Sequence, residues 1–366
     1  MRYLIMKLLR LANTLNPTSA PYNQFSLGFK DEYEQTFCSL LENEIPIDNK
    51  VKGHHCRGSI WKMFWTLKEL IKENDFDIIH IHSGLTGLIF ILAIFPFNLF
   101  LLKKTVFTLH NSWNVLKIRN QFLNFVVMLF SKKVCTCGVS SRESIPKIIN
   151  LFINNKTLPI VNGFDNLRID RVEINIKEGK HFTNNSKLKI VCVGALNKTK
   201  NQIALLKALK KIQLDAEVIF LGDGQNSSYL RDFSKNISKP TKIIFQGRVS
   251  RDLAIEHMLE ADVSISVSKG EGLPIAVLES MYAGCYTILS SIPPHLEISP
   301  PDDRCYFIDL HNSKDIENSL VYVQNNLEKI KASRDKSKDH TKMNFSVTRM
   351  LKEYRQVYES LISCEK

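Results

Sequence analysis

The segment that decides the fold is Gly270-Glu271-Gly272-Leu273-Pro274-Ile275-Ala276-Val277-Leu278-Glu279-Ser280-Met281-Tyr282-Ala283-Gly284. It follows residues 261–268, in which apolar and polar side chains alternate as they do in a buried strand. Pro274 predicts the first position of a helix, because a helix leaves the N–H group at that position without a partner. A strand, a turn and a helix in this order are typical of a parallel sheet covered by helices.

Two carboxylates accompany this predicted helix start. Glu271 lies on the turn, and Glu279 lies one to two turns into the helix. The free N–H groups at the start of a helix bind anions, and carboxylates next to them accept hydrogen bonds from hydroxyl groups. The combination suits a phosphorylated, polyhydroxylated ligand such as a nucleotide sugar. The alternative is an ordinary helix with one glutamate at a buried edge and one in solvent.

Outward from this segment, short apolar strands alternate with helical stretches along the whole chain. This pattern predicts an α/β fold with parallel sheets and helices on both faces. The 366 residues exceed one ordinary core and predict two domains. Residues 166–186 have the polar composition of a linker between them. The predicted strands are 8–12, 77–82, 105–109, 134–139 and 158–161 in the first half, and 189–193, 217–221, 242–246, 262–267, 286–290 and 305–308 in the second.

The composition narrows the classes of binding partner and the cellular compartment that we expect for the protein. A net charge of +12 predicts an acidic partner, for which nucleotides, nucleic acids and anionic lipids are the candidates. The eight cysteines include no C-x-x-C pair, so we expect reduced thiols in a cytoplasmic protein. Residues 1–15 do not resemble a signal peptide, and Met6 is an alternative start. The apolar stretch 85–102 is interrupted by Pro96 and Asn98, which favours a core helix and a surface loop over a membrane span.

The positive charge is unevenly distributed. No Asp or Glu lies between Ile78 and Arg142. An acid-free surface with aromatic side chains suits docking on an anionic membrane; the alternative is that the aromatics are core and the cations are merely solvated. The cations are Lys103, Lys104, Lys117, Arg119, Lys132, Lys133 and Arg142, and the aromatics are Phe95, Phe97, Phe100, Phe122 and Phe125.

The pattern E-G-x-P-x-x-x-x-E-x-x-x-x-G, from Glu271 to Gly284, resembles the signature of retaining glycosyltransferases of the GT-B fold, family 4 in particular. Residues 191–202 (VCVGALNKTKNQ) resemble the family's diphosphate-binding loop V-G-R-L-x-x-x-K-G, with Gly194 and Lys200 at its glycine and lysine. Ala195 stands where the family often has arginine, so one expected phosphate cation is missing. Lys198 is a candidate to replace it.

The resemblance implies two Rossmann-like domains facing across a cleft. Residues 1–165 would bind the acceptor, residues 166–345 the nucleoside diphosphate sugar, and residues 346–366 would form a helix that crosses back to the first domain. Lys200 and the helix start at Gly272 and Leu273 would hold the departing diphosphate. Lys200 and Glu279 would face a solvated cleft.

The resemblance also implies roles for individual side chains. Glu271 would orient the sugar hydroxyls and Glu279 would bind the ribose. His110, in the sequence Thr108-Leu109-His110, would contact the sugar near the reaction centre. Asn162 and Gly163 resemble the family's I-P-N-G-V-D turn, where the backbone would approach the donor.

Other motifs carry weaker signals. Gly222-Asp223-Gly224 matches the family's G-x-G loop but also reads as a plain turn. His80 and His82 share one face of a predicted strand but lack a third metal ligand, so zinc is disfavoured. No D-x-D metal motif serves the phosphates, and Asp302-Asp303 is a poor candidate, so we expect metal independence and no cofactor. Residues 18–24 and 292–297 depart from the family's Gly-Gly loops, although Glu297 keeps its place.

The sequence therefore predicts a retaining glycosyltransferase that moves a sugar from a nucleoside diphosphate sugar to a saccharide or lipid-linked saccharide. The setting would be lipopolysaccharide or capsule synthesis at the inner face of the cytoplasmic membrane. One alternative is a GT-B nucleotide-sugar epimerase or phosphorylase. Another is a non-enzymatic protein that binds nucleic acid or anionic membranes. Glycine turns at strand ends favour a small-ligand enzyme that binds no nucleic acid.

Overall fold

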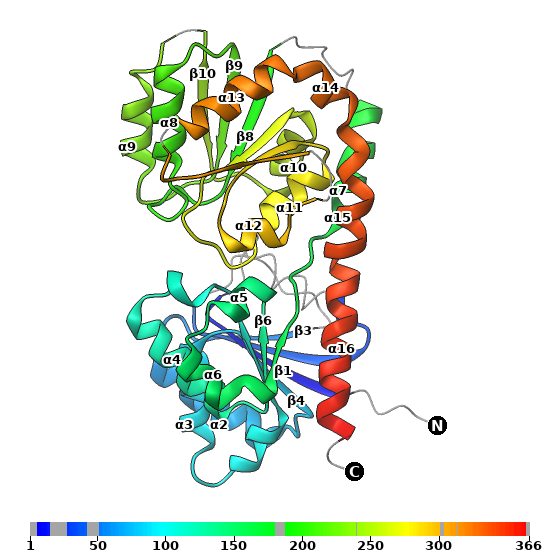
Figure 1. The fold of residues 1–366 in the computed structure, drawn as a ribbon. Helices are drawn as coiled ribbons and strands as arrows, with labels where there is room; N and C mark the ends of the chain where they lie inside the picture. Colours follow the sequence, from blue (N-terminus) through cyan, green and yellow to red (C-terminus); the bar gives the residue numbers. More distant parts are fainter. Residues whose placement is uncertain are drawn as a thin grey trace. The chain divides into compact units, whose positions relative to one another are not determined.

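The computed structural model describes residues 6–14, 28–41, 51–179, 187–238, 240–300, 304–312 and 314–363. The chain forms two compact units (Figure 1). Unit 1 comprises Met1–Gly163 and Val347–Lys366, and unit 2 comprises Phe164–Ser346. The sequence placed the boundaries after residues 165 and 345, one or two residues from these positions.

The described residues of unit 1 form a seven-stranded, fully parallel sheet in the order β3-β2-β1-β4-β5-β6-β7. The sequence analysis missed β2 and β3. β2 buries the polar Gln35, whose Oε1 accepts a hydrogen bond from Arg10 Nε of β1 at 2.8 Å, so its apolar pattern is interrupted. The strands are β1 (Met6–Ala12), β2 (Tyr33–Ser39), β3 (Val51–His55), β4 (Ile78–Ile81), β5 (Thr105–Leu109), β6 (Lys133–Thr136) and β7 (Thr157–Pro159).

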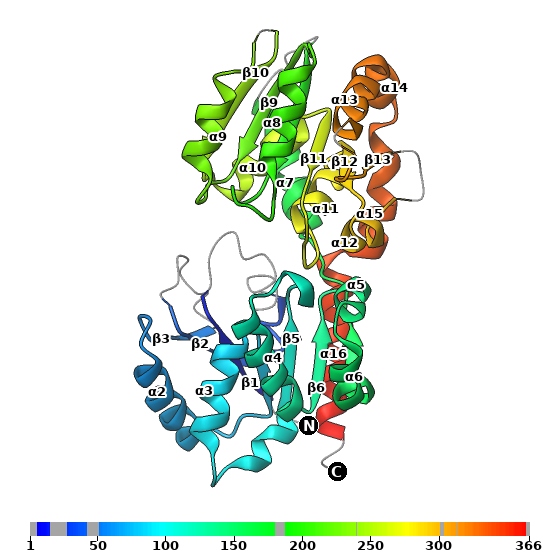
Figure 2. The same cartoon turned by 60° about the vertical axis from the view of Figure 1, so that its left-hand side comes forward.

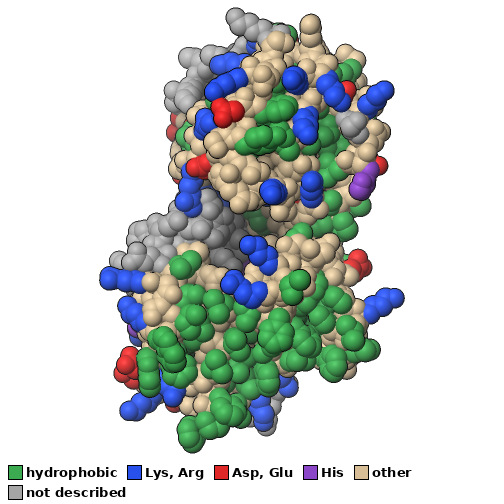
Figure 3. Space-filling model, turned by 90° about the vertical axis from the view of Figure 1, so that its left-hand side faces the viewer, with side chains coloured by type: hydrophobic (Ala, Val, Ile, Leu, Met, Phe, Trp, Pro, Cys, Tyr) green, Lys and Arg blue, Asp and Glu red, His purple; other side chains and the backbone are tan. Residues whose placement is uncertain are grey.

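Helices cover both faces of this sheet because alternate strand residues point to opposite sides. Leu9 and Leu11 of β1 pack under one helical layer, whereas Leu8 packs under α16 (Val347–Ser363) on the other face. The first layer, seen in Figure 2, exposes many apolar side chains outward (Figure 3). Its helices are α2 (Ile60–Glu73), α3 (Gly84–Ile94), α4 (Ile118–Phe130) and α6 (Lys147–Ile153); α5 (Val139–Glu143) and the 3-10 turns η1 (Leu99–Lys104), η2 (Trp113–Val115) and η3 (Asn154–Lys156) connect them.

Two sequence predictions about apolar and polar stretches had different outcomes. The stretch 85–102 forms α3, whose residues Ile89 and Phe90 are buried, and then a short 3-10 turn. Among the described residues no helix is long and apolar enough to cross a membrane. The prediction of a linker at 166–186 was wrong for its first part, which is α7 (Asn166–Gly179). Ile169, Val172 and Ile176 are buried at helical spacing inside an otherwise polar stretch.

Unit 2 contains a six-stranded, fully parallel sheet in the order β10-β9-β8-β11-β12-β13. Every strand predicted in the second half is present. The strands are β8 (Leu188–Val193), β9 (Ala216–Leu221), β10 (Lys242–Gly247), β11 (Val263–Ser266), β12 (Tyr286–Ser290) and β13 (Cys305–Ile308). The helices are α8 (Gln202–Lys211), α9 (Ser227–Ser234), α10 (Arg251–Glu260), α11 (Ile275–Tyr282), α12 (Pro293–Glu297), α13 (Asp315–Asn325), α14 (Leu327–Ala332) and α15 (Lys338–Phe345), with the 3-10 turn η4 (Arg334–Ser337).

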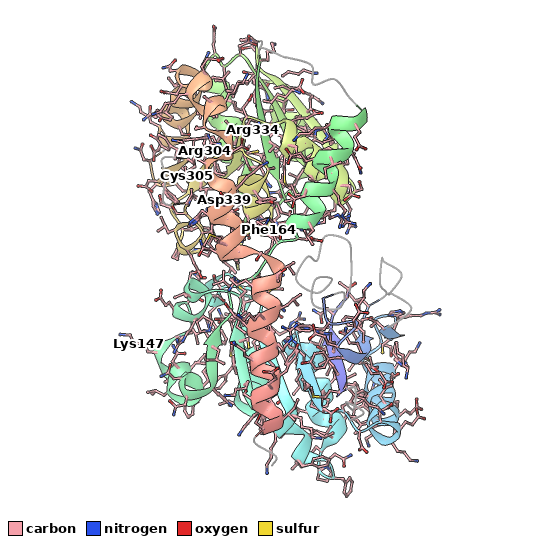
Figure 4. The ribbon with its side chains drawn as sticks, turned by 90° about the vertical axis from the view of Figure 1, so that its right-hand side faces the viewer. Lys147, Phe164, Arg304, Cys305, Arg334 and Asp339 are labelled. Carbon is pink, nitrogen blue, oxygen red and sulfur yellow. The ribbon has the colours of Figure 1, made fainter. Side chains whose placement is uncertain are left out.

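Two arginines, labelled in Figure 4, explain the last glycine of the deciding segment. Gly284 has φ +91°, and a Cβ atom there would lie 2.5 Å from Arg334 Cγ. Arg304 is fully buried and donates to the Gly284 carbonyl at 2.8 Å, while Arg334 donates to the Ala261 carbonyl at 3.0 Å. The arginines thus satisfy carbonyls at the ends of α10 and α11, and Gly284 leaves room for them.

Candidate active site

Each sheet has a topological switch point, where the strand order reverses. In unit 2 it lies between β8 and β11, because β9 and β10 continue from β8 on one side and β12 and β13 extend from β11 on the other. In unit 1 it lies between β1 and β4. Open parallel sheets bind ligands at the carboxyl ends of the strands at such points.

The switch point of unit 2 carries the ion pair Lys200–Glu271. Lys200 follows β8 and Glu271 follows β11, and Lys200 Nζ donates to Glu271 Oε1 at 2.6 Å. Ser268 Oγ donates to the same oxygen at 2.6 Å. The backbone N–H of Lys269 donates to the Thr199 carbonyl at 2.8 Å, which ties the two loops together. The structure therefore unites two residues that the sequence placed in separate motifs.

The electrostatics of this pair favour an ionised carboxylate. Burial raises the pKa of Glu271, but the Lys200 charge and the hydrogen bonds from Lys200 and Ser268 outweigh burial and hold the pKa below its ordinary value. Glu271 is therefore ionised at neutral pH. A cation and an anion stand side by side at the place where a ligand would bind.

Glycines pack the loops of unit 2 closely together. Gly194 has φ +141°, and a Cβ atom there would lie 3.3 Å from Lys200 Cε. Gly222 has φ +133°, and a Cβ atom there would lie 2.2 Å from the Gly194 carbonyl oxygen. A Cβ atom on Gly224 would lie 2.5 Å from the Leu196 carbonyl oxygen. The G-x-G loop thus lets the loops after β8 and β9 approach each other.

Glu279 lies on α11 and is buried, with 5% of its side chain exposed. It pairs with Arg251 at the start of α10. Burial raises the pKa of Glu279, although the Arg251 charge and hydrogen bond act in the opposite direction. The expectation that Glu279 faces a solvated cleft was therefore wrong. The carboxylate instead finds its main partner inside unit 2.

The sequence analysis missed Arg251. Ser250 caps α10 by accepting a hydrogen bond from Leu253 N at 3.2 Å, so Arg251 stands in the first helical turn. A cation there opposes the helix dipole, which is a signal that the side chain has a specific partner elsewhere. Only the tertiary structure identifies that partner as Glu279.

Gly272 and Leu273 form the turn between β11 and α11. The helix begins at Ile275 with Pro274 as its N-cap, one residue later than the sequence predicted. Val277 N and Leu278 N donate to the Pro274 carbonyl at 3.0 and 3.2 Å. The turn therefore leads from Glu271 directly to the helix start.

The switch point of unit 1 contains a pocket of about 190 Å³. Asn13 follows β1, His82 follows β4 and His110 follows β5, and all three line it. His82 Nδ1 and His110 Nε2 are 3.0 Å apart, so one donates a hydrogen bond to the other. Among the described residues, the remaining lining includes Ser83, Asn111, Asn120 and Asn124 as hydrogen-bonding side chains and Arg119 as a cation, and none of it is acidic.

The histidines near this pocket are neutral at pH 7. Burial lowers the pKa of His110 to about 4. Burial also lowers the pKa values of His80 and His82 well below the ordinary value, and the Arg10 charge adds to the effect on His80. His80 lies in the sheet, where its Nδ1 is 2.7 Å from Tyr358 Oη and its Nε2 is 2.8 Å from Thr108 Oγ1. Among the described residues, no three His, Cys, Asp or Glu side chains form a group suited to a metal ion.

Asn162 and Gly163 lie after β7 in unit 1, against α16. Asn162 N donates to the Cys137 carbonyl at 2.9 Å, and Gly163 N contacts Met350 Sδ at 3.2 Å. Gly194, Lys200 and Glu271 therefore lie together in unit 2, whereas the turn at Asn162 and Gly163 belongs to unit 1. Residues 18–24, which depart from the family's Gly-Gly loop, and the pair Asp302-Asp303 lie outside the described residues.

The fold and the sequence point to one family. The structure resembles that of HepE from Anabaena, solved with UDP and glucose, with a TM-score of 0.75 and 16% identity over 97% of this chain and 100% of that chain. Residues 32–143 match the family Glycosyltransferase Family 4, and residues 173–340 match the family Glycosyl transferases group 1. The chain is a GT-B glycosyltransferase.

Similar glycosyltransferases occur in archaea and bacteria. An uncharacterized glycosyltransferase of Methanocaldococcus jannaschii is 26% identical, over 83% of this chain and 79% of its own length. The capsular polysaccharide biosynthesis glycosyltransferase CapH of Staphylococcus aureus is 25% identical, over 73% of this chain and 76% of its own length. This GT-B glycosyltransferase is thus related to capsular polysaccharide glycosyltransferases.

Proposed function

We propose that this GT-B glycosyltransferase transfers a sugar, with retention at the anomeric carbon, from a nucleoside diphosphate sugar to a saccharide or lipid-linked saccharide of a cell-surface polysaccharide. Unit 2 binds the donor and unit 1 binds the acceptor. The observation that carries the proposal is the Lys200–Glu271 pair at the switch point of unit 2. The UDP and glucose in the HepE structure and the capsular role of CapH support the two substrate classes.

In this proposal Lys200 binds the departing diphosphate. Its ammonium group is a compact point charge, 26% of the side chain is exposed, and it stands at the ligand-binding end of the sheet. The positive charge stabilises the negative charge that develops on the leaving group. Because a side chain supplies this charge, we propose that the reaction needs no divalent metal ion.

Glu271 positions the sugar. Without ligand its carboxylate accepts hydrogen bonds from Lys200 and Ser268. When a diphosphate engages Lys200, the ionised carboxylate becomes an acceptor for sugar hydroxyl groups. Holding the sugar in one orientation contributes to the rate through proximity.

The proposal also gives roles to Glu279 of unit 2 and to His110 of unit 1. Arg251 holds the Glu279 carboxylate in one position, and only the 5% of its side chain that stays exposed would be open to the ribose hydroxyls. His110 is neutral at pH 7 and can either donate or accept a hydrogen bond. We propose that it contacts the reacting sugar.

Donor turnover and product stereochemistry test this function. The purified protein is incubated with a panel of nucleoside diphosphate sugars and saccharide acceptors, and release of the nucleoside diphosphate is measured. The anomeric configuration of the product is read by NMR. We expect release from one donor and an unchanged configuration. A product of inverted configuration would contradict retention, and failure of every nucleoside diphosphate to bind would contradict the donor site.

A further inference from the structure

One face of unit 1 exposes an unusual number of large apolar side chains. Figure 3 shows them spread over the helical layer in the lower part of the view. Phe97 is 88% exposed, Ile118 84% and Leu151 82%. We call the apolar face the surface formed by Trp61 of α2, Phe97 after α3, Ile118 and Phe122 of α4, and Leu151 and Phe152 of α6.

The apolar face is one continuous surface. α2 packs on α3, α3 on α4, and α4 on α6. The rings of Phe125 and Phe152 are 6.3 Å apart and join the last two helices. The alternative that the aromatics of this region are core is wrong for Phe95, Phe97, Phe100 and Phe122, which are exposed, and holds in part for Phe125. Large exposed apolar patches on soluble proteins mark interaction sites, so a surface that spans four helices points to a partner.

The charge around the face identifies that occupant. Lys103, Lys117 and Lys147 are exposed there, and Lys147 points away from the unit in Figure 4. No acidic residue lies between Ile78 and Arg142, the part of the chain that contributes Phe97, Ile118 and Phe122, whereas Glu69 and Glu73 of α2 and Glu143 before α6 are exposed outside it. A second copy of the chain would place these cations against one another. An anionic bilayer offers acyl chains to the apolar side chains and phosphate groups to the lysines.

The apolar face adjoins the pocket of unit 1. Ile118 and Phe122 of α4 belong to the face, while Arg119, Asn120 and Leu123 of the same helix line the pocket. The polar pocket therefore opens beside a surface suited to lipid. This arrangement fits an acceptor whose polar end is a saccharide and whose other end is anchored in a membrane.

We propose that the apolar face docks on an anionic lipid bilayer and brings the pocket of unit 1 to a membrane-anchored acceptor. The docking part of this proposal is argued from the apolar face and its charges alone, whereas the part that concerns the acceptor rests on the proposed function. The helices lie on the bilayer, with Trp61 and its apolar neighbours in the interfacial region and the lysines at the phosphate groups.

Vesicle binding tests the proposal directly. The protein is mixed at low salt with vesicles of phosphatidylglycerol and phosphatidylcholine, or of phosphatidylcholine alone, and bound protein is measured by sedimentation. Tryptophan emission provides a second readout, because Trp61 and Trp65 are exposed whereas Trp113 is buried. We expect binding to the anionic vesicles only, with a blue shift of the emission, and release as salt screens the charges.

Substitutions locate the docking surface. Lys103→Glu, Lys117→Glu and Lys147→Glu together should weaken binding to anionic vesicles by about a hundredfold. Lys104 and Lys133 are poorer choices, since Lys104 Nζ donates to the Phe76 carbonyl and Lys133 is half-buried in β6. Ile118→Ser with Leu151→Ser should abolish the blue shift. The matched controls are Lys352→Glu on α16, Tyr229→Ser on α9 and Met343→Ser on α15, which are exposed elsewhere and should bind as the parent does.

The outcomes separate docking from catalysis. Absence of parent binding to anionic vesicles at low salt, or equal binding by the parent and the face variants, would overturn the proposal. A concentration-dependent dimer that the same substitutions disrupt would assign the face to a second copy instead. UDP binding is measured on the same variants and should be unchanged. Vesicle binding by a protein that binds no nucleoside diphosphate would leave docking intact and overturn the proposed function.

Discussion

At the switch point of unit 2 an ammonium group faces a carboxylate, Lys200 Nζ to Glu271 Oε1 at 2.6 Å; at the switch point of unit 1 two imidazoles face each other, His82 Nδ1 to His110 Nε2 at 3.0 Å. Both sites stand at the carboxyl ends of strands in parallel sheets of the same design. The backbone thus provides the position, and the side chains decide the chemistry.

The difference teaches which ligand each unit can take. In unit 2 the charged pair suits a ligand with negative charge and hydroxyl groups, because a diphosphate can replace Glu271 as the partner of Lys200. In unit 1 the neutral histidines and the amides around them suit uncharged hydroxyl groups, as a saccharide would offer. Substitutions in the two sites should therefore have different effects.

The largest effect is expected for Glu271→Gln. The substitution removes the carboxylate that we propose orients the sugar, and we expect hydrolysis of the nucleotide sugar to fall about a hundredfold or more. The rate of nucleoside diphosphate release measures it. Glu328→Gln on the exposed surface of α14 is the control and should retain the parent rate. A Glu271→Gln rate within a factor of about two of the parent, that is, a difference of about 0.4 kcal/mol or less in the activation free energy, would remove Glu271 from the site.

A large loss of stability is expected for Arg251→Ala. It leaves the buried Glu279 carboxylate without its main partner, and removing one member of a buried ion pair destabilises a protein by about 3 kcal/mol or more. Urea unfolding of the variant measures the change. Lys235→Ala breaks the exposed Lys235–Asp232 pair of the same unit and should lower the unfolding free energy by less than about 1 kcal/mol. Equal losses for both variants would show that burial of Glu279 has been overestimated.

A smaller effect is expected from the histidines of unit 1 at acidic pH. The pKa of His110 is about 4 in the folded protein and 6.5 when unperturbed, so the unfolded chain binds more protons between these values. The stability that the neutral His110 contributes is fully present above pH 6.5 and is lost as the pH falls towards about 4. His110→Asn should flatten this decline of the melting temperature, whereas His340→Asn, on the surface of α15, should not. An unchanged slope in His110→Asn would show that His110 ionises freely.

The smallest effect is expected from chelation. Because the proposal assigns the positive charge that offsets the diphosphate to Lys200, EDTA should leave the rate of donor turnover unchanged. The assay compares the rate with EDTA, with added Mg²⁺ and with added Mn²⁺. Loss of turnover in EDTA that either metal restores would contradict the role of Lys200.

The sequence predicted those features that depend on local pattern. The strands of unit 2 are continuous apolar runs, and Lys200 and Glu271 stand in motifs with fixed glycine spacing, so both could be found without a structure. β2 was missed because the polar Gln35 interrupts its apolar pattern. Gln35 can be buried there only because it accepts a hydrogen bond from Arg10 of β1, a partner that the sequence does not reveal. The Arg251–Glu279 pair was missed for the same reason, since its members are far apart in the chain and meet only after folding.

The central claim is that Lys200 and Glu271 bind the diphosphate and the sugar of the donor, and calorimetric titration with UDP and the other nucleoside diphosphates tests it most directly. Lys200→Ala with Glu271→Gln removes both charges together and so leaves no unpaired carboxylate in the site. The account predicts that this double variant binds the preferred nucleoside diphosphate at least about tenfold more weakly than the parent, because a hydrogen bond to a charged group contributes about 1.5–3 kcal/mol. Lys207→Ala, exposed on α8 of the same unit, should bind as the parent does. Equal affinity of the double variant and the parent would contradict the account.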